Sequence, residues 1–170
     1  MWVGVDICNT ICNVNLELVR RFGVRLDAYP VPGLEREWFG TPEGLRVLFA
    51  AEPFPNAADV LRHLAEAGYR VAYLSSRPPE AEFATRRWLA LHGFPDAPLA
   101  FVPRGAKAGI AKRERFAAFF EDDPEEIRAL THVGVKVLVK DWPYNRHVPA
   151  QARFKKWAEA LQAGAACLSW

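Results

Sequence analysis

The sequence predicts an α/β fold in which a parallel β-sheet lies between two layers of helices (α/β/α). Short apolar runs, typical of buried strands, alternate along the chain with segments whose apolar residues recur every three or four positions. Such alternation implies right-handed crossovers between parallel strands. The chain has 170 residues, of which 51% are hydrophobic and 25% charged, so it can bury a sizeable core. We therefore expect residues 1–170 to form a single domain.

The expected elements begin with a strand over residues 2–7, which carries Asp6 near its end. A helix over residues 13–22 follows and ends at Gly23. A second helix is expected to begin with Asn56 as its N-cap and to end at Gly68. The later strands are predicted at 71–74, 99–102, 116–120 and 135–139, and the later helices from Pro78 to Gly93 and at 107–113, 124–132 and 150–163. The last helix is expected to carry Phe154, Trp157, Ala158 and Leu161 on its inner face.

Residues 24–55 interrupt this alternation. Proline and glycine recur through the stretch, and only residues 43–49 have the pattern of a short amphipathic helix. We expect a small insertion here, placed after the first strand and within the single domain.

Composition and charge exclude several classes of protein. The 22 Lys and Arg residues nearly balance 20 Asp and Glu residues, and a net charge of +2 is too small for a protein whose main partner is a nucleic-acid polymer. No apolar run approaches the ~20 residues of a membrane span, and no basic segment precedes Asp6. Three cysteines cannot close as a set of disulfides, so we expect reduced thiols, a cytoplasmic location and no membrane partner. The sequence leaves open whether the chain is a monomer or a homodimer.

Polar residues follow several predicted strands at the point where each strand ends. Asp6 ends the first strand, Ser75 and Ser76 follow the second, and the acidic run from Glu121 to Asp123 follows the fourth. Lys107 begins the helix between the third and fourth strands. In an open parallel sheet these positions share one edge, where ligands bind. Carboxylates, hydroxyls and a cation suit Mg²⁺ and phosphoryl transfer, although Asp123, which precedes Pro124, is better placed to cap the next helix.

The order of these residues resembles the haloacid dehalogenase (HAD) superfamily. Its motifs are an Asp-x-Asp-x-Thr strand end, a Ser or Thr, a Lys and a late acidic pair. Here they correspond to Asp6-Ile7-Cys8-Asn9-Thr10, Ser75-Ser76-Arg77-Pro78, Lys107 and Glu121-Asp122-Asp123-Pro124. Together with the late run from Asp141 to Arg146, these strings look like bacterial relatives of the 5′(3′)-deoxyribonucleotidases. The resemblance implies a Rossmann-like HAD fold, a small helical cap at about 24–55, and a phosphatase acting on a small phosphorylated substrate such as a nucleoside monophosphate.

The resemblance also implies roles for individual residues. Asp6 would be the nucleophile that forms an aspartyl-phosphate, and Mg²⁺ would be held by Asp6, the Cys8 backbone carbonyl and Asp122. The phosphate-binding residues would be Asn9, Thr10, Ser75, Ser76 and Lys107. Lys112 is an alternative to Lys107, since both precede the fourth strand. Glu121 is expected behind these residues, orienting either metal-bound water or the lysine, and Arg77 is expected in the same supporting layer.

Cys8 departs from the family pattern, because phosphatases of this superfamily have there an Asp that serves as general acid and base. A thiol with an ordinary pKa near 8.5 is a poor substitute, and losing such a group typically costs about 10²- to 10⁴-fold in rate. Three outcomes fit: substrates whose leaving group needs no proton, an acid supplied by another residue such as one in the cap, or a protein that binds a phosphorylated ligand without turning it over.

Two further assignments stay open. Tyr29, Trp38 and Phe39 in the insertion either stack on a nucleobase or form the small core of the cap. His147, which follows the run from Asp141 to Arg146, is the only histidine that we expect near the site. We do not expect a zinc site at Cys8 and Cys12, because such a site needs two more ligands and no Cys-x-x-Cys pair or nearby histidine offers them.

Overall fold

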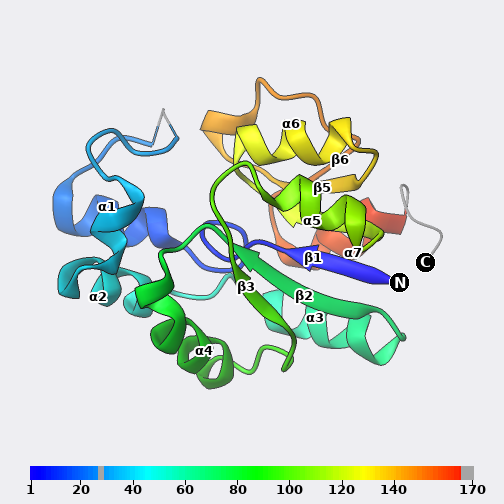
Figure 1. The fold of residues 1–170 in the computed structure, drawn as a ribbon, viewed down its shortest axis with the longest axis horizontal. Helices are drawn as coiled ribbons and strands as arrows, with labels where there is room; N and C mark the ends of the chain where they lie inside the picture. Colours follow the sequence, from blue (N-terminus) through cyan, green and yellow to red (C-terminus); the bar gives the residue numbers. More distant parts are fainter. Residues whose placement is uncertain (27–28, 166–170) are drawn as a thin grey trace.

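The computed structural model describes residues 1–26 and 29–165, and these form a six-stranded parallel sheet in the order β3-β2-β1-β4-β5-β6 (Figure 1). The strands are β1 (Trp2–Val5), β2 (Arg70–Ser75), β3 (Leu99–Phe101), β4 (Phe116–Glu121), β5 (Lys136–Lys140) and β6 (Ala152–Phe154). The helices are α1 (Val14–Phe22), α2 (Pro42–Ala50), α3 (Ala57–Glu66), α4 (Glu82–Leu91), α5 (Lys107–Arg113), α6 (Pro124–His132) and α7 (Trp157–Ala165), with short 3₁₀ turns η1 (Arg36–Gly40), η2 (Pro79–Ala81) and η3 (Pro143–Asn145). The predicted α/β/α class is confirmed.

Helices cover both faces of the sheet because successive strand residues point to opposite sides. Val3 and Val5 join the core that packs against α1, α2, α3, α4 and α7. The alternate strand residues join a second core with α5 and α6, which lie on the other side of the sheet from α3 (Figure 1). The chain runs outward from β1 to β3, then returns to β4 on the other side of β1. This reversal of direction at β1 and β4 is where an open parallel sheet forms its binding crevice.

The end of the chain differs from the sequence prediction, because the helix expected over 150–163 is two elements. Residues Ala152–Phe154 form β6 beside β5, and α7 begins only at Trp157. Arg153 points away from the buried side chains of its two neighbours and bonds Asp141 at 3.2 Å, an alternation that suits a strand. The inner face of α7 is correspondingly shifted: Trp157 and Ala160 are buried, whereas Ala158 is exposed.

The predicted N-cap of α3 is also wrong in its mechanism. Asn56 precedes the helix, but it adopts a left-handed conformation with φ of 66° and its side chain makes no capping hydrogen bond. Asparagine tolerates this conformation better than most residues, so it serves the tight entry of the chain into α3.

The stretch predicted as an insertion contains η1 and α2, which contact each other, and α2 also contacts α1 and α4. Val47 and Leu48 of α2 join the same core as β1, so this helix is anchored to the main body. Arg36 in η1 donates to the backbone carbonyls of Ser76 and Arg77, each at 2.9 Å. The insertion is thereby tied to the loop that follows β2. None of the described helices has the length and apolarity needed to cross a membrane.

Gly4 allows β1 to lie close to two phenylalanines of β4. A methyl group at this position would lie 2.2 Å from Cδ2 of Phe119 and 2.8 Å from Cδ2 of Phe116, and Phe119 is fully buried. We expect Gly4→Ala to lower the free energy of unfolding by about 1–3 kcal/mol, the usual cost of an overpacked core. Urea denaturation measures this. The matched control is Gly109→Ala on α5, where the methyl group meets open space and no loss is expected; equal losses in the two variants would contradict the packing argument.

Candidate active site

The candidate site lies at the carboxyl ends of β1, β2 and β4. Asp6 directly follows β1, and its backbone N–H donates to the carbonyl of Phe120 in β4 at 2.9 Å. Ser75 ends β2 and Glu121 ends β4. The strand ends therefore bring together residues that are more than 100 positions apart in the sequence.

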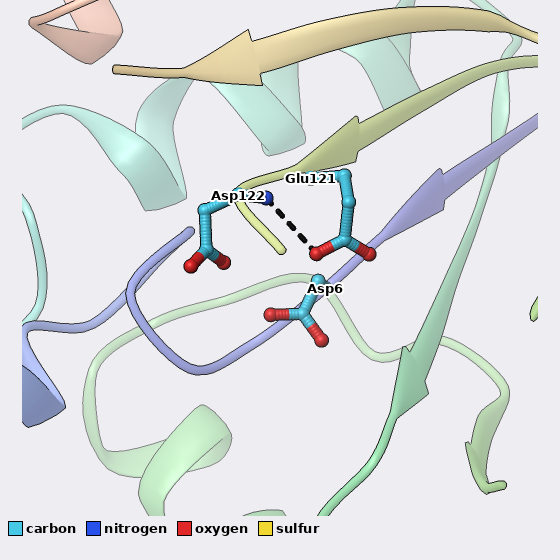
Figure 2. Close-up of side chains that lie close together, drawn as sticks. All are labelled: Asp6, Glu121 and Asp122. Carbon is cyan, nitrogen blue, oxygen red and sulfur yellow. Dashed lines mark hydrogen bonds between the residues drawn. The ribbon is translucent and has the colours of Figure 1, made fainter. Parts of the chain in front are cut away.

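Three buried carboxylates meet at this edge, as Figure 2 shows. One oxygen from each of Asp6, Glu121 and Asp122 lies within 4.8 Å of the others. Glu121 is fixed by the backbone N–H groups of Asp122 and Asp123, which donate to its Oε1 at 2.9 and 3.1 Å. Burial, followed by the charge of Asp6, raises the pKa of Asp122 well above its usual range. These carboxylate oxygens would repel one another if no cation lay among them. Oxygen ligands of this kind suit a hard divalent ion such as Mg²⁺.

Lys107, the first residue of α5, supplies the positive charge within this cluster. Its Nζ donates to Oδ1 of Asp6 at 2.5 Å and to Oε2 of Glu121 at 2.7 Å, and the residue is only 1% exposed. Burial alone would lower the pKa of Lys107, but the two carboxylates more than offset this and hold it well above the usual value. Lys112, the alternative, is exposed on the same helix. The structure thus brings Lys107 to the site, and Glu121 contacts the lysine, one of the two partners expected for it.

Asp122 is held by three residues from distant parts of the chain. Thr10 Oγ1 donates to its Oδ1 at 2.7 Å, Tyr144 Oη donates to its Oδ2 at 2.6 Å, and Asn145 Nδ2 donates to its backbone carbonyl at 2.8 Å. Thr10 was expected to bind phosphate, but its hydroxyl is fully buried against Asp122 and does not line the cavity. The supporting roles of Tyr144 and Asn145 were not predicted. The sequence feature that could have indicated them is the polar run from Asp141 to Arg146, because it follows β5 and β5 ends at the same edge of the sheet.

A cavity of about 390 Å³ opens above Asp6 and Lys107. One side of it is formed by strand-end residues and by the loops that follow them, including Asp6, Cys8, Asn9, Ser75, Ser76, Arg77, Lys107 and Glu121. The insertion forms the opposite wall with Tyr29, Arg36 and Phe39, among others. Trp38 does not line the cavity; it packs edge-on against Phe22 and Phe39. Of the three aromatic residues singled out, two therefore face the cavity and one belongs to the packing of the insertion.

Several predicted phosphate-binding residues lie along the cavity. Asn9 is in a left-handed conformation with φ of 58°, and its Oδ1 accepts from the Asn15 backbone N–H at 2.9 Å. Ser75 Oγ accepts from the Arg77 backbone N–H at 3.2 Å, so its own hydroxyl hydrogen is not used in that bond. The Ser76 hydroxyl is buried and has no hydrogen-bond partner among the described residues. These loops present polar groups to the same space as Asp6 and Lys107.

Cys8 lies at the cavity with its thiol against Arg77. The Arg77 Nε donates to the Cys8 Sγ at 3.1 Å, while Nη2 donates to the Cys12 Sγ at 3.4 Å and Nη1 to the Thr85 hydroxyl at 2.9 Å. Loss of solvent raises the pKa of the Cys8 thiol, and Arg77 offsets only part of this rise. The group at position 8 is therefore a neutral thiol near pH 7, unable to replace a carboxylate as acid or base. Both described cysteines are free thiols, and Cys167 lies outside the described residues.

Two neighbouring residues have structural roles. Asp123 caps α6 by accepting from the Glu125 backbone N–H at 2.9 Å, as predicted, and it also binds Arg104 at 2.5 and 2.7 Å. His147 contacts Arg128 at 2.8 Å on an exposed surface, away from the acidic cluster. It lines a separate groove that shares only Tyr29 and Arg104 with the cavity.

Comparison with solved structures defines the class of fold. A HAD-superfamily hydrolase from Geobacter sulfurreducens aligns over 95% of this chain and 94% of its own with a TM-score of 0.58 and 12% identity. A D,D-heptose 1,7-bisphosphate phosphatase from B. bronchiseptica, solved with magnesium and phosphate, aligns over 97% and 98% with a TM-score of 0.60 and 12% identity. The chain has the HAD-like fold that its motif order predicts.

Sequence comparison gives the nearer resemblance. A Bacillus cereus protein described as a "putative nucleotidase" is 28% identical over 113 residues, which are 65% of this chain and 59% of that protein. A protein of the same description from Oceanobacillus iheyensis is 29% identical over 112 residues, 64% of this chain and 60% of its own. The match thus spans about three fifths of each relative. A family model described as the LNS2 domain of PITM 1-3 matches residues 48–118. The chain is similar in sequence to these nucleotidase-like proteins, as its motifs indicated.

Proposed function

We propose that the chain is a Mg²⁺-dependent phosphatase that acts on a small phosphomonoester through an aspartyl-phosphate on Asp6. The observation that carries the proposal is the buried contact of Asp6 with Lys107, inside a cluster of three carboxylates of which Asp6 and Glu121 line the cavity. Phosphoryl transfer needs a positioned nucleophile and positive charge on the phosphoryl oxygens, and this cluster supplies the first and part of the second.

The residues of the chain divide these tasks. The free Oδ2 of Asp6 attacks phosphorus, while Lys107 holds Oδ1 and neutralises charge on the phosphoryl group. Ser75, Ser76 and Asn9 offer hydrogen-bond donors to the remaining oxygens. Asp6, Asp122 and the Cys8 carbonyl would hold Mg²⁺, with Glu121 and Thr10 fixing the lysine and Asp122. The metal would supply further neutralisation of negative charge and orient the phosphate.

A nucleoside monophosphate is the proposed substrate class. Support comes from the two similar bacterial proteins, which are described as nucleotidases. The cavity also supports it, because its volume of about 390 Å³ lies within the usual range for a small ligand. Tyr29 and Phe39 in the cavity wall are suitable faces for a flat base. In this proposal residues 24–55 are the cap that selects the substrate, the location is cytoplasmic, and the chain acts as a monomer or homodimer without a nucleic-acid or membrane partner.

A second function is favoured by one observation, the neutral thiol at position 8. Without a carboxylic acid there, the same cavity would bind a phosphorylated ligand and turn it over slowly or not at all. Fold alone does not decide between the two, because one fold hosts both enzymes and binding proteins.

Phosphate release separates these functions. The full chain would be incubated with deoxyribonucleoside and ribonucleoside monophosphates, sugar phosphates and p-nitrophenyl phosphate, with Mg²⁺ or with EDTA. We expect turnover with Mg²⁺ that EDTA abolishes and that added Mg²⁺ restores. Absence of turnover throughout, together with a rise in melting temperature on adding a nucleoside monophosphate, would instead support the binding protein.

A further inference from the structure

Arg77 is a buried cation that forms no ion pair with a carboxylate of the described residues, although the charge of Asp6 acts on it without direct contact. It is 4% exposed, and its three side-chain hydrogen bonds go to two thiols and one hydroxyl, all neutral. Sulfur is a weak acceptor, and a guanidinium has five N–H donors, so these contacts satisfy it poorly. Burying a charge with neutral partners is costly unless an anion compensates it. Arg77 is therefore suited to meet an anion that is not a side chain of the described residues.

The position of Arg77 indicates where this anion would lie, because its side chain contacts Cys8 rather than the acidic cluster. Lys107 is bound to Asp6 and Glu121, whereas the Arg77 Nε lies 3.1 Å from the sulfur at position 8. Both Arg77 and Cys8 line the cavity. In the proposed function, position 8 is where a general acid would meet the leaving oxygen. The guanidinium thus lies next to the place where a negative charge develops when no proton is supplied.

We infer that Arg77 replaces the missing general acid by stabilising the leaving group as an anion, which makes turnover efficient for aryl phosphates, acyl phosphates and phosphoanhydrides and slower for a nucleoside monophosphate, whose leaving oxygen is more basic. This inference rests on the proposed function. In the step, an oxygen of Asp6 forms a bond to phosphorus, the bond from phosphorus to the leaving oxygen breaks, and the electron pair stays on that oxygen opposite the guanidinium. One water then hydrolyses the aspartyl-phosphate, which returns the Asp6 carboxylate and releases inorganic phosphate and a proton to solvent.

The loop contacts of Arg77 suit such a role because they hold the guanidinium in place. Nη1 is fixed by Thr85, which is fully buried in α4. The backbone of Arg77 is held from both sides: its N–H donates to Ser75 Oγ at 3.2 Å and its carbonyl accepts from Arg36 at 2.9 Å. A preorganised charge of this kind is what stabilises a developing anion effectively.

The test is a series of aryl phosphates whose leaving groups range from p-nitrophenol to phenol, whose pKa is near the ~10 of a tyrosine side chain. The quantity compared is kcat/KM, which reports the steps up to departure of the leaving group. We expect Arg77→Met to lower kcat/KM for phenyl phosphate by about 10²- to 10³-fold and for p-nitrophenyl phosphate by less than about tenfold. Arg77→Lys, which keeps a charge, should recover much of the loss.

The control is Arg104→Met, which removes another arginine of the same cavity that binds Asp123 and contacts neither Cys8 nor the loop of Arg77. Its effect should be similar for every substrate, so that only Arg77→Met steepens the dependence on leaving-group pKa. A uniform loss in Arg77→Met, or no loss, in protein with an unchanged melting temperature would overturn the inference while leaving the phosphatase intact. If Arg77→Met does not fold, Arg77→Gln, which keeps hydrogen-bond donors but removes the charge, is measured in its place and should steepen the dependence in the same way. A wild-type protein that hydrolyses none of the esters would overturn the proposed function itself.

Discussion

Asp6→Asn is expected to reduce phosphate release by at least about 10⁴-fold, the scale seen when an enzyme loses its nucleophile. An amide cannot attack phosphorus, whereas its size matches that of the carboxyl group. The variant also turns the charged contact with Lys107 at 2.5 Å into a neutral one, so the lysine is held less firmly beside the point of attack. Steady-state phosphate release with Mg²⁺ measures the loss, and mass spectrometry of acid-quenched wild-type protein should detect the aspartyl-phosphate on Asp6.

Asp123→Asn is the matched control for this prediction. Asp123 is an adjacent buried acid that also borders the cavity, but it caps α6 and binds Arg104. Asparagine is an equally good cap, so we expect turnover within about tenfold of the wild type. If Asp6→Asn retained turnover comparable to that of Asp123→Asn, a covalent intermediate on Asp6 would be wrong, and direct attack by water would replace it.

The elements that the sequence predicts best are those with strong local signals. The helix over 124–132 was predicted with the bounds of α6, because Asp123 caps it, Pro124 begins it and its apolar residues keep helical spacing. By contrast, β6 has only three residues and owes its conformation to pairing with β5 and to the bond between Arg153 and Asp141. Such tertiary contacts leave no periodic pattern in a short segment, so the sequence favoured a helix there.

The candidate site shows the same division. The motif order located Asp6, Lys107 and Asp122 at one edge of the sheet, but sequence spacing alone did not choose between Lys107 and Lys112. The structure decides between them, because Lys107 is buried and donates to Asp6 from the start of α5, whereas Lys112 is exposed. Thr10, Tyr144 and Asn145 support Asp122 through contacts that span from 22 to 112 positions in the sequence. Contacts of that range depend on how β1, β4 and β5 are ordered in the sheet.

Cys8→Asp is expected to raise kcat/KM for phenyl phosphate by about 10²-fold or more, since a positioned general acid contributes about 10²- to 10⁴-fold. For p-nitrophenyl phosphate, whose leaving group needs no proton, the change should stay within about tenfold. The new carboxyl group would face the Arg77 Nε, now 3.1 Å from the Cys8 sulfur. An arginine partner lowers the pKa of a carboxyl group and so weakens it as an acid. We therefore expect the gain to lie toward the lower end of this range.

Two further variants isolate the cause of this gain. The asparagine of Cys8→Asn has nearly the same shape as the aspartic acid of Cys8→Asp but carries no acidic proton, so Cys8→Asn should show no gain in kcat/KM. Adding Arg77→Met to Cys8→Asp removes the ion pair, so the carboxyl group keeps its proton at a higher pH. Arg77→Met should therefore lower the turnover of phenyl phosphate less in the Cys8→Asp protein than in the wild type. If Cys8→Asp left turnover undetectable while Mg²⁺ and a nucleoside monophosphate still raised the melting temperature, the missing acid would not be what limits the site. The cavity would then be that of a protein that binds its phosphorylated ligand without cleaving it.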